Sequence, residues 1–265
     1  MLTTTAAEMG WYLYGITRRE PLADSLASLQ LFEFAGLAAV VRPVLLADFR
    51  AAALQERLQD ASALEAAVRS HNDVIEAIHA RQAILPAKFG MVYTRADDLV
   101  SSLQSAHDVL LDQVERLEGC DEWAVHVYAD PAIVRERVAT QDPAIQLLRE
   151  QCAASRPGRA YFLEQQLREE LTATTAETLS SLAQNVFDRL ARFAVARAMN
   201  PVAATAAADG GVEILRASFL VARDRAEQFQ HEVRASADTA EGLRSEYTGP
   251  WPPYSFAATN DTDAP

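Results

Sequence analysis

The stretch that most constrains the fold lies near the end of the chain, at residues 247–256, which read YTGPWPPYSF. Its prolines fix φ and restrict the residues before them, so the segment can form neither a helix nor a central strand. Trp251, Tyr254 and Phe256 carry too much apolar surface to be left in water without cause. We therefore expect residues 249–256 to form an extended strap that packs either on its own protein, which we favour, or on a partner.

Composition narrows both the fold class and the function. The chain has 265 residues, of which 49% are hydrophobic, and this is enough for two domains that each have a core. A net charge of −13 disfavours a nucleic-acid partner, because affinity for phosphate backbones depends on clustered Lys and Arg. No window reaches the roughly 18 apolar residues of a membrane span, and residues 1–10 lack the basic and apolar regions of a signal peptide. We expect a cytoplasmic protein with no membrane partner.

The first half of the chain is predicted to mix strands and helices. A helix begins at Thr94, which forms a capping-box pattern with Asp97, and runs through Leu117 until Gly119 ends it. Because a new strand follows, we place the domain boundary there and predict an N-terminal α+β domain at 1–119. Its other predicted elements are strands at 11–17, 29–34 and 37–44, helices at 49–58 and 61–80, and a bulged strand or shaped loop at 83–94.

The second half, 120–265, is predicted to be a ferredoxin-like α+β domain that carries the strap. After a strand at 123–129, short helices open at Pro131 and Pro143, and an apolar periodicity from Arg159 to Val195 predicts one very long helix or two in line. Strands at 202–206 and 212–222, a helix at 223–236 and a strand at 243–248 complete the pattern. This order matches the βαββαβ plan.

Candidate catalytic and metal-binding patterns are absent from the sequence. His71 and His79 are eight residues apart without a His-x-x-x-His pattern, and we interpret them as surface histidines. Cys120 and Cys152 have neither metal nor redox spacing. His126 alternates with apolar neighbours in a predicted strand, which is typical of a half-buried histidine with a partner and not of a catalytic base. We expect no catalytic residues, no metal and no cofactor.

Three short segments contribute candidate residues for partner binding or structural anchoring. A proline and a glycine bracket the middle segment, which predicts either a simple core turn or a fixed loop that presents its central residues. The second segment is a helix start, where free N–H groups and a guanidinium suggest an anion site or a structural anchor. The strap is the third. The candidates are Pro86, Lys88, Phe89 and Gly90; Gly158, Arg159 and Tyr161; and Pro250, Trp251, Tyr254 and Phe256.

Five motifs, in this order, resemble the gas vesicle protein L/F family. The resemblance covers nearly the whole chain and is most specific at the terminal Gly-Pro-Trp-Pro-Pro-Tyr-Ser-Phe string. Two departures stand out: Lys88 occupies a position where the family pattern has arginine, and Tyr161-Phe162-Leu163 replaces Tyr-Leu-Leu. The motifs are Tyr12 to Gly15, Leu85 to Gly90, Trp123 to Tyr128, Gly158 to Leu163 and Thr248 to Phe256.

The resemblance implies a non-enzymatic accessory protein of gas vesicle formation. It implies association with the small hydrophobic shell protein and with other gas vesicle accessory proteins, and a location in the cytoplasm or on the gas vesicle. The alternative is a small-molecule-binding regulatory protein or an enzyme on a ferredoxin-like scaffold, because fold alone does not determine function. A deep pocket with converging polar groups would favour the alternative, whereas an exposed apolar patch would favour shell binding.

Overall fold

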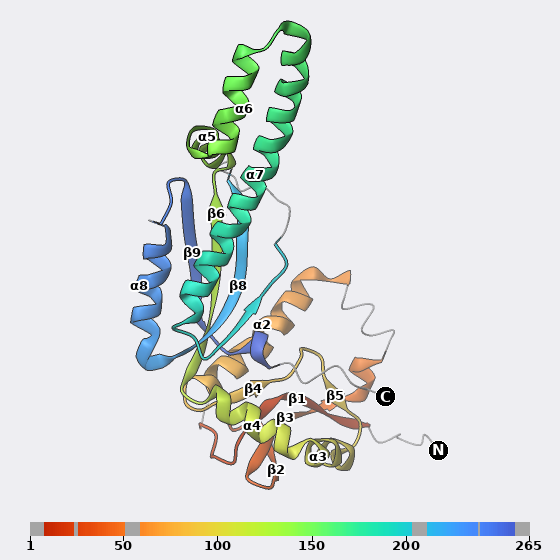
Figure 1. The fold of residues 1–265 in the computed structure, drawn as a ribbon. Coiled ribbons are helices and arrows are strands. Elements are labelled where there is room, and N and C mark those ends of the chain that lie inside the picture. The colour runs from red at the N-terminus through yellow and green to blue at the C-terminus, as the bar shows by residue number, and fades with distance from the viewer. Residues whose placement is uncertain (1–7, 24–25, 51–58, 203–210, 238, 258–265) are drawn as a thin grey trace, which may run out of the picture. The chain divides into compact units, whose positions relative to one another are not determined.

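The computed structural model describes residues 8–23, 26–50, 59–202, 211–237 and 239–257. The chain divides into two compact units (Figure 1): Met1–Glu122 with Pro250–Pro265, and Trp123–Gly249. The domain boundary predicted after Gly119 assigned the strap to the second domain. In the structure the division falls after Glu122, and the strap belongs to the first unit because its side chains pack and hydrogen-bond there.

The first unit is built on a five-stranded antiparallel sheet with the order β2-β3-β1-β4, in which β5 also pairs with β1. The expected central strand is β1. At Gly15 it lies so close to β4 that an added Cβ would be 2.5 Å from the Leu85 carbonyl oxygen, so only glycine fits there. The strands are β1 (Met9–Arg18), β2 (Gln30–Phe34), β3 (Leu37–Leu45), β4 (Ile84–Pro86) and β5 (Val92–Tyr93).

Three helices pack on this sheet. Helix α2 (Ala61–His79) begins at Asp60, whose carboxylate accepts from the N–H groups of Ser62 and Ala63, and it shares a core with Tyr12 and Tyr14 of β1. Helix α3 (Ala96–Ser105) contacts β2. Helix α4 (His107–Leu117) contacts both β1 and β4. They bury Leu99, Leu103, Leu110 and Val114.

Two helix predictions in this unit are wrong in part. The helix predicted at 49–58 does not begin at Phe49, because Phe49 ends a 3₁₀ turn (Leu46–Phe49) and Arg50 is extended; residues 51–58 lie outside the described residues, so the rest of this prediction is not tested. The single helix expected after Thr94 is divided at Ala106 into α3 and α4, and its N-cap is Arg95, which makes no side-chain capping bond. The Thr94–Asp97 pair therefore does not form a capping box.

The second unit has a four-stranded sheet with the order β7-β8-β6-β9. Trp123 and Val125 of β6 and Phe219 of β8 form a core with side chains of α7 and α8, including Phe187 and Phe229. The element order follows the βαββαβ plan with α5 and α6 added before α7. The elements are β6 (Cys120–Ala129), α5 (Pro131–Gln141), α6 (Pro143–Ala154), α7 (Pro157–Ala191), β7 (Ala196–Met199), β8 (Val212–Ala222), α8 (Ala226–Ala237) and β9 (Leu243–Trp251).

Helix α7 is a single helix of 35 residues, and α6 packs beside its first half as a helical hairpin that extends beyond the sheet (Figure 1). The helix ends at Ala191, earlier than the predicted Val195, because residues 196–199 pair with β8 as strand β7. The strand expected at 202–206 lies almost wholly outside the described residues. Strand β9 continues through Pro250 to Trp251, which a sheet-edge strand tolerates.

A candidate docking site on the first unit

The loop between β4 and β5, Ala87–Met91, is held in one shape by β1. The Ala87 N–H donates to the Tyr14 carbonyl at 2.9 Å, and the Leu13 N–H donates to the Met91 carbonyl at 3.0 Å. Gly90 has a φ of 86°, a left-handed conformation that favours glycine. These bonds fix the loop on both sides of Lys88 and Phe89, which are both exposed.

Beneath this loop lies His71 of α2, which the sequence analysis wrongly placed on the surface. Its ring is buried, stacked on Tyr14 with centroids 5.4 Å apart and touched edge-on by Phe89 at 5.5 Å. The Gly90 N–H donates to the Tyr12 hydroxyl at 3.1 Å, so this hydroxyl can donate in turn to His71 Nδ1, 2.9 Å away. His79 is also buried, with Nε2 2.8 Å from the Asp121 carboxylate.

Burial keeps His71, Tyr12 and Tyr14 uncharged at neutral pH. Burial lowers the pKa of His71, because it disfavours the charged ring, and the Ala87 carbonyl raises this pKa by a smaller amount. Burial also raises the pKa of Tyr12 and of Tyr14. Nε2 of His71 has no hydrogen-bond partner within the described part of the chain.

The strap closes on the same unit. Phe256 is only 8% exposed, and Pro252 and Pro253 are buried. Ser255 donates twice to the buried Glu122 carboxylate, from its N–H at 2.8 Å and from its hydroxyl at 2.5 Å. The Tyr254 hydroxyl donates to Asn72 Oδ1 at 3.0 Å. These contacts explain why the strap belongs to the first unit.

The loop and the strap meet at an open pocket of about 330 Å³, lined by His71, Asn72, Ala87, Lys88, Phe89 and Tyr254. Phe89 is 44% and Tyr254 39% exposed. Burial, with the nearby Glu76 and Glu122 charges, raises the pKa of Tyr254 to about 12, so the hydroxyl is neutral. The hydroxyl and His71 Nδ1 already have partners in the protein. Apart from the Lys88 ammonium at its rim, the pocket therefore offers mainly neutral aromatic surface, which suits an apolar side chain.

The structure brings together some sequence-predicted candidates and not others. Lys88, Phe89 and Tyr254 line the pocket, with Gly90 and Phe256 shaping the loop and the strap. Pro86 ends β4, and Pro250 and the 44% exposed Trp251 end β9. Gly158, Arg159 and Tyr161 belong to the second unit, where they are exposed at the start of α7.

His71 and Tyr12 are site residues that the sequence analysis missed. Tyr12 was noted only as part of a motif. His71 falls at the spacing of the apolar residues Leu64, Val68 and Ile75 on α2, and this periodicity was the available signal of its burial.

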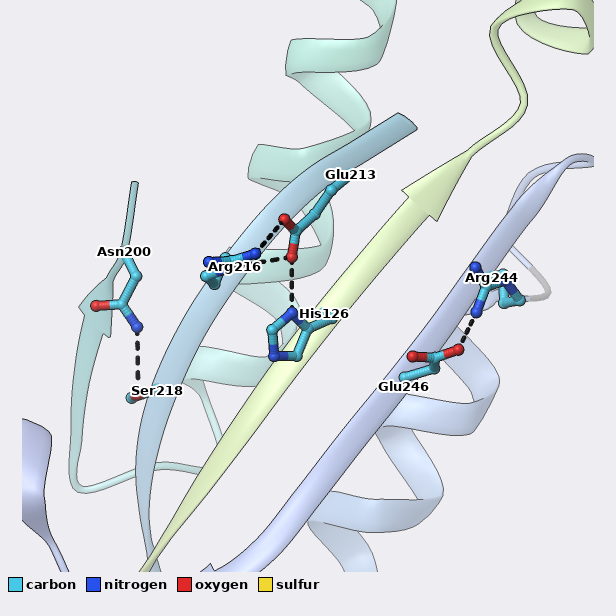
Figure 2. Close-up of polar contacts among 7 residues, drawn as sticks. All are labelled: His126, Asn200, Glu213, Arg216, Ser218, Arg244 and Glu246. Carbon is cyan, nitrogen blue, oxygen red and sulfur yellow. Dashed lines mark hydrogen bonds and ion pairs between the residues drawn. The ribbon is translucent and has the colours of Figure 1, made fainter. Parts of the chain in front are cut away.

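A polar network crosses the sheet of the second unit (Figure 2). Glu213 accepts two bonds from Arg216, at 3.1 and 2.7 Å, and its Oε1 is 2.6 Å from His126 Nδ1. Burial alone would raise the pKa of Glu213, but the bonds from Arg216 and His126 outweigh it and lower the pKa. His126 thus has a partner, as the sequence indicated. Arg244 and Glu246 form a second ion pair on β9.

No group of three or more His, Cys, Asp or Glu side chains among the described residues is placed to hold a metal ion. None of the described helices combines the length and the apolar character that a membrane crossing requires.

Fold and site together define an α+β protein of two compact units with an aromatic pocket in the first. The chain belongs to the gas vesicle synthesis protein GvpL/GvpF family, whose model matches residues 10–258. It is 32% identical to gas vesicle protein L of Streptomyces sp. (strain CB03234) over 240 residues, covering 88% of this chain and 85% of the relative. Gas vesicle protein F of the same strain is 26% identical over 250 residues, covering 94% and 99%.

Solved structures share the fold. The crystal structure of the gas vesicle protein GvpF from Anabaena sp. PCC7120 matches with a TM-score of 0.70 at 21% identity, covering 95% of this chain and 99% of that one. GvpF from Microcystis aeruginosa matches with a TM-score of 0.60 at 18% identity, covering 94% and 99%. The expected α+β fold class and the resemblance to the L/F family are both confirmed.

Proposed function

We propose that this gas vesicle protein is an accessory factor that binds the small hydrophobic shell protein in the cytoplasm and assists its assembly by binding, without catalysing a reaction. The observation that carries the proposal is the pocket of the first unit, where Phe89 and Tyr254 present exposed aromatic surface on two segments held by hydrogen bonds. A pre-formed apolar site loses little entropy on binding.

The physical need for such a factor follows from the shell itself. Gas vesicle walls keep out liquid water with an apolar inner surface, and subunits carrying such a surface aggregate unless they are covered. A carrier with a net charge of −13 repels copies of itself and stays soluble while one apolar surface is engaged. Other gas vesicle accessory proteins are further partners under this proposal.

Substitution of Phe89 tests the site. We expect Phe89→Ala to weaken capture of the co-expressed shell protein at least about tenfold, because exposed aromatic anchors dominate interface energies. Val109→Ala is the matched control, since Val109 is also an exposed apolar residue of the first unit, 56% exposed on α4. Circular dichroism should show both variants folded. Equal capture by the Phe89 variant and the control would remove this pocket from the proposal.

One observation favours the alternative of a small-molecule ligand. Nε2 of the buried His71 makes no well-aligned hydrogen bond among the described residues, although the Ala87 carbonyl acts on the ring, and an uncharged ligand with an acceptor atom would supply a better partner. Native mass spectrometry of protein purified from its host distinguishes the two. A stoichiometric small molecule that His71→Phe releases would support the alternative, and its absence from the wild-type protein would leave shell binding as the function of the pocket.

A further inference from the structure

The α6–α7 hairpin of the second unit has little core of its own. Ile145 and Leu171 pack in the cluster at its base, but no residue between them in the chain is buried. Leu148, Leu163 and Leu167 are half-buried, which accounts for one seam between the two helices. Two helices in contact bury one stripe each, whereas bundles of four bury a continuous core. The outer faces of the hairpin are therefore open for a partner.

Large apolar side chains lie on those outer faces. Phe162 is 72% and Tyr161 66% exposed, with their rings in edge contact 5.8 Å apart, and Leu147 of α6 is 54% exposed.

The charge pattern of the hairpin is compatible with a second copy of the chain. The segment from Gln146 to Glu170 is neutral, although the whole chain carries −13, so net charge does not oppose the approach of an identical segment there. Arg159, Phe162, Gln166 and Glu170 recur at spacings of three and four residues and so share one face of α7. Neither Arg159 nor Glu170 forms an ion pair with another residue that the structure describes.

We propose that the face of α7 formed by Arg159, Phe162, Gln166 and Glu170 pairs with the same face of a second copy of the chain. In an antiparallel arrangement with a two-fold axis near Glu164, Arg159 of each copy lies opposite Glu170 of the other, and the two Phe162 rings pack beside the axis. A two-fold interface requires such self-complementarity, because each residue must find its partner on an identical surface. The hairpins then form a four-helix bundle that covers their exposed apolar residues.

Charge reversal in the full-length protein tests this pairing. Sedimentation velocity from low micromolar to the highest soluble concentration should show a monomer–dimer equilibrium for the wild type. Arg159→Glu and Glu170→Arg should each raise the dimer dissociation constant at least about tenfold, since each creates two like-charge contacts. The double variant Arg159→Glu with Glu170→Arg should restore the dimer, because the charges are then complementary again.

Phe162→Ser should also shift the equilibrium to monomer, whereas Val109→Ser in the first unit should leave it unchanged. All substituted positions are exposed, and unchanged circular dichroism would show that the fold is intact. Three results would overturn the proposal: a wild-type protein that stays monomeric throughout, a dimer that the single reversals do not weaken, or a double variant that remains monomeric. Shell capture in the Phe89 experiment does not depend on this outcome.

Discussion

At the residue scale, Glu213 and Glu246 form a matched comparison, because both pair with an arginine on the second sheet but differ in burial (Figure 2). The Glu213 side chain is 3% exposed and that of Glu246 54%. We expect Glu213→Gln to lower the free energy of unfolding by about 2–3 kcal/mol, because it weakens a buried charged network. Glu246→Gln should cost less than about 1 kcal/mol, as exposed pairs do. Urea unfolding followed by circular dichroism measures both.

The contribution of Glu213 to the free energy of unfolding should decrease as the pH falls. The folded pKa of Glu213 is lowered, so its ionised form stabilises the native state at neutral pH, and that stabilisation is lost as the pH falls through the lowered pKa. As the pH falls below about 4.3, the pKa of an unfolded glutamate, the stability gap between wild type and Glu213→Gln should shrink. A gap that stays the same down to about pH 3 would show that ionisation of Glu213 does not stabilise the fold.

At the scale of elements, the strap couples the end of the chain to the first unit. Truncation after Trp251 keeps β9 but removes Phe256 from its buried site and leaves the Glu122 carboxylate without Ser255. We expect a loss of at least about 3 kcal/mol of unfolding free energy, since burial of a phenylalanine alone contributes that much. Truncation after Ala257, which keeps all described residues of the strap, is the control.

Melting temperature and shell capture together decide what the strap does. If the shorter protein melts like the full chain while shell capture disappears, the strap is a partner contact and not a closing element. Loss of both would fit a strap that holds Tyr254 at the pocket.

Residue composition and apolar periodicity predicted those helices and strands whose sequence pattern lies wholly within the element itself. The aromatic and β-branched run of β1, the apolar stripe of α2 and the breaker-free periodicity of α7 each describe one segment, and each segment folds as predicted. The break at Ala106 has no proline or glycine to mark it, and the end of α7 is set by pairing of residues 196–199 with β8. Strand pairing, a tertiary contact, thus overrode the helical pattern at the end of α7.

The site required more than local pattern. Its parts come from β1, α2, the 87–91 loop and the strap, and no spacing along the chain shows that Tyr12, His71, Phe89 and Tyr254 meet. The motifs identified three of these four residues one by one. The aromatic cluster that joins them around His71 is a property of the folded unit.

At the scale of the whole molecule, the acidic charge and the apolar surfaces have separate roles. Under the proposed function, the net charge of −13 opposes close approach of copies of the chain, except through segments that carry no net charge such as residues 146–170, and it acts over about a Debye length, roughly 8 Å at physiological ionic strength. The proposed contact with the shell protein is made by neutral rings, Phe89 and Tyr254, which salt does not screen. Shell binding should consequently respond to ionic strength much less than a charge-driven complex does.

We therefore predict that capture of the shell protein changes less than about threefold between low and high salt, because burial of apolar area contributes most of the affinity. Pull-down from cells that co-express both proteins, washed at each ionic strength, measures this change. A charge-dependent complex would instead lose most of its affinity at high salt, and that result would move the contact from the aromatic pocket to charged surface.

A deletion strain tests the function in the cell, and electron microscopy should show that it lacks normal vesicles. If no complex forms at either salt and the deletion strain still makes normal vesicles, the accessory function fails, and a small-molecule ligand for the His71 pocket becomes the better account.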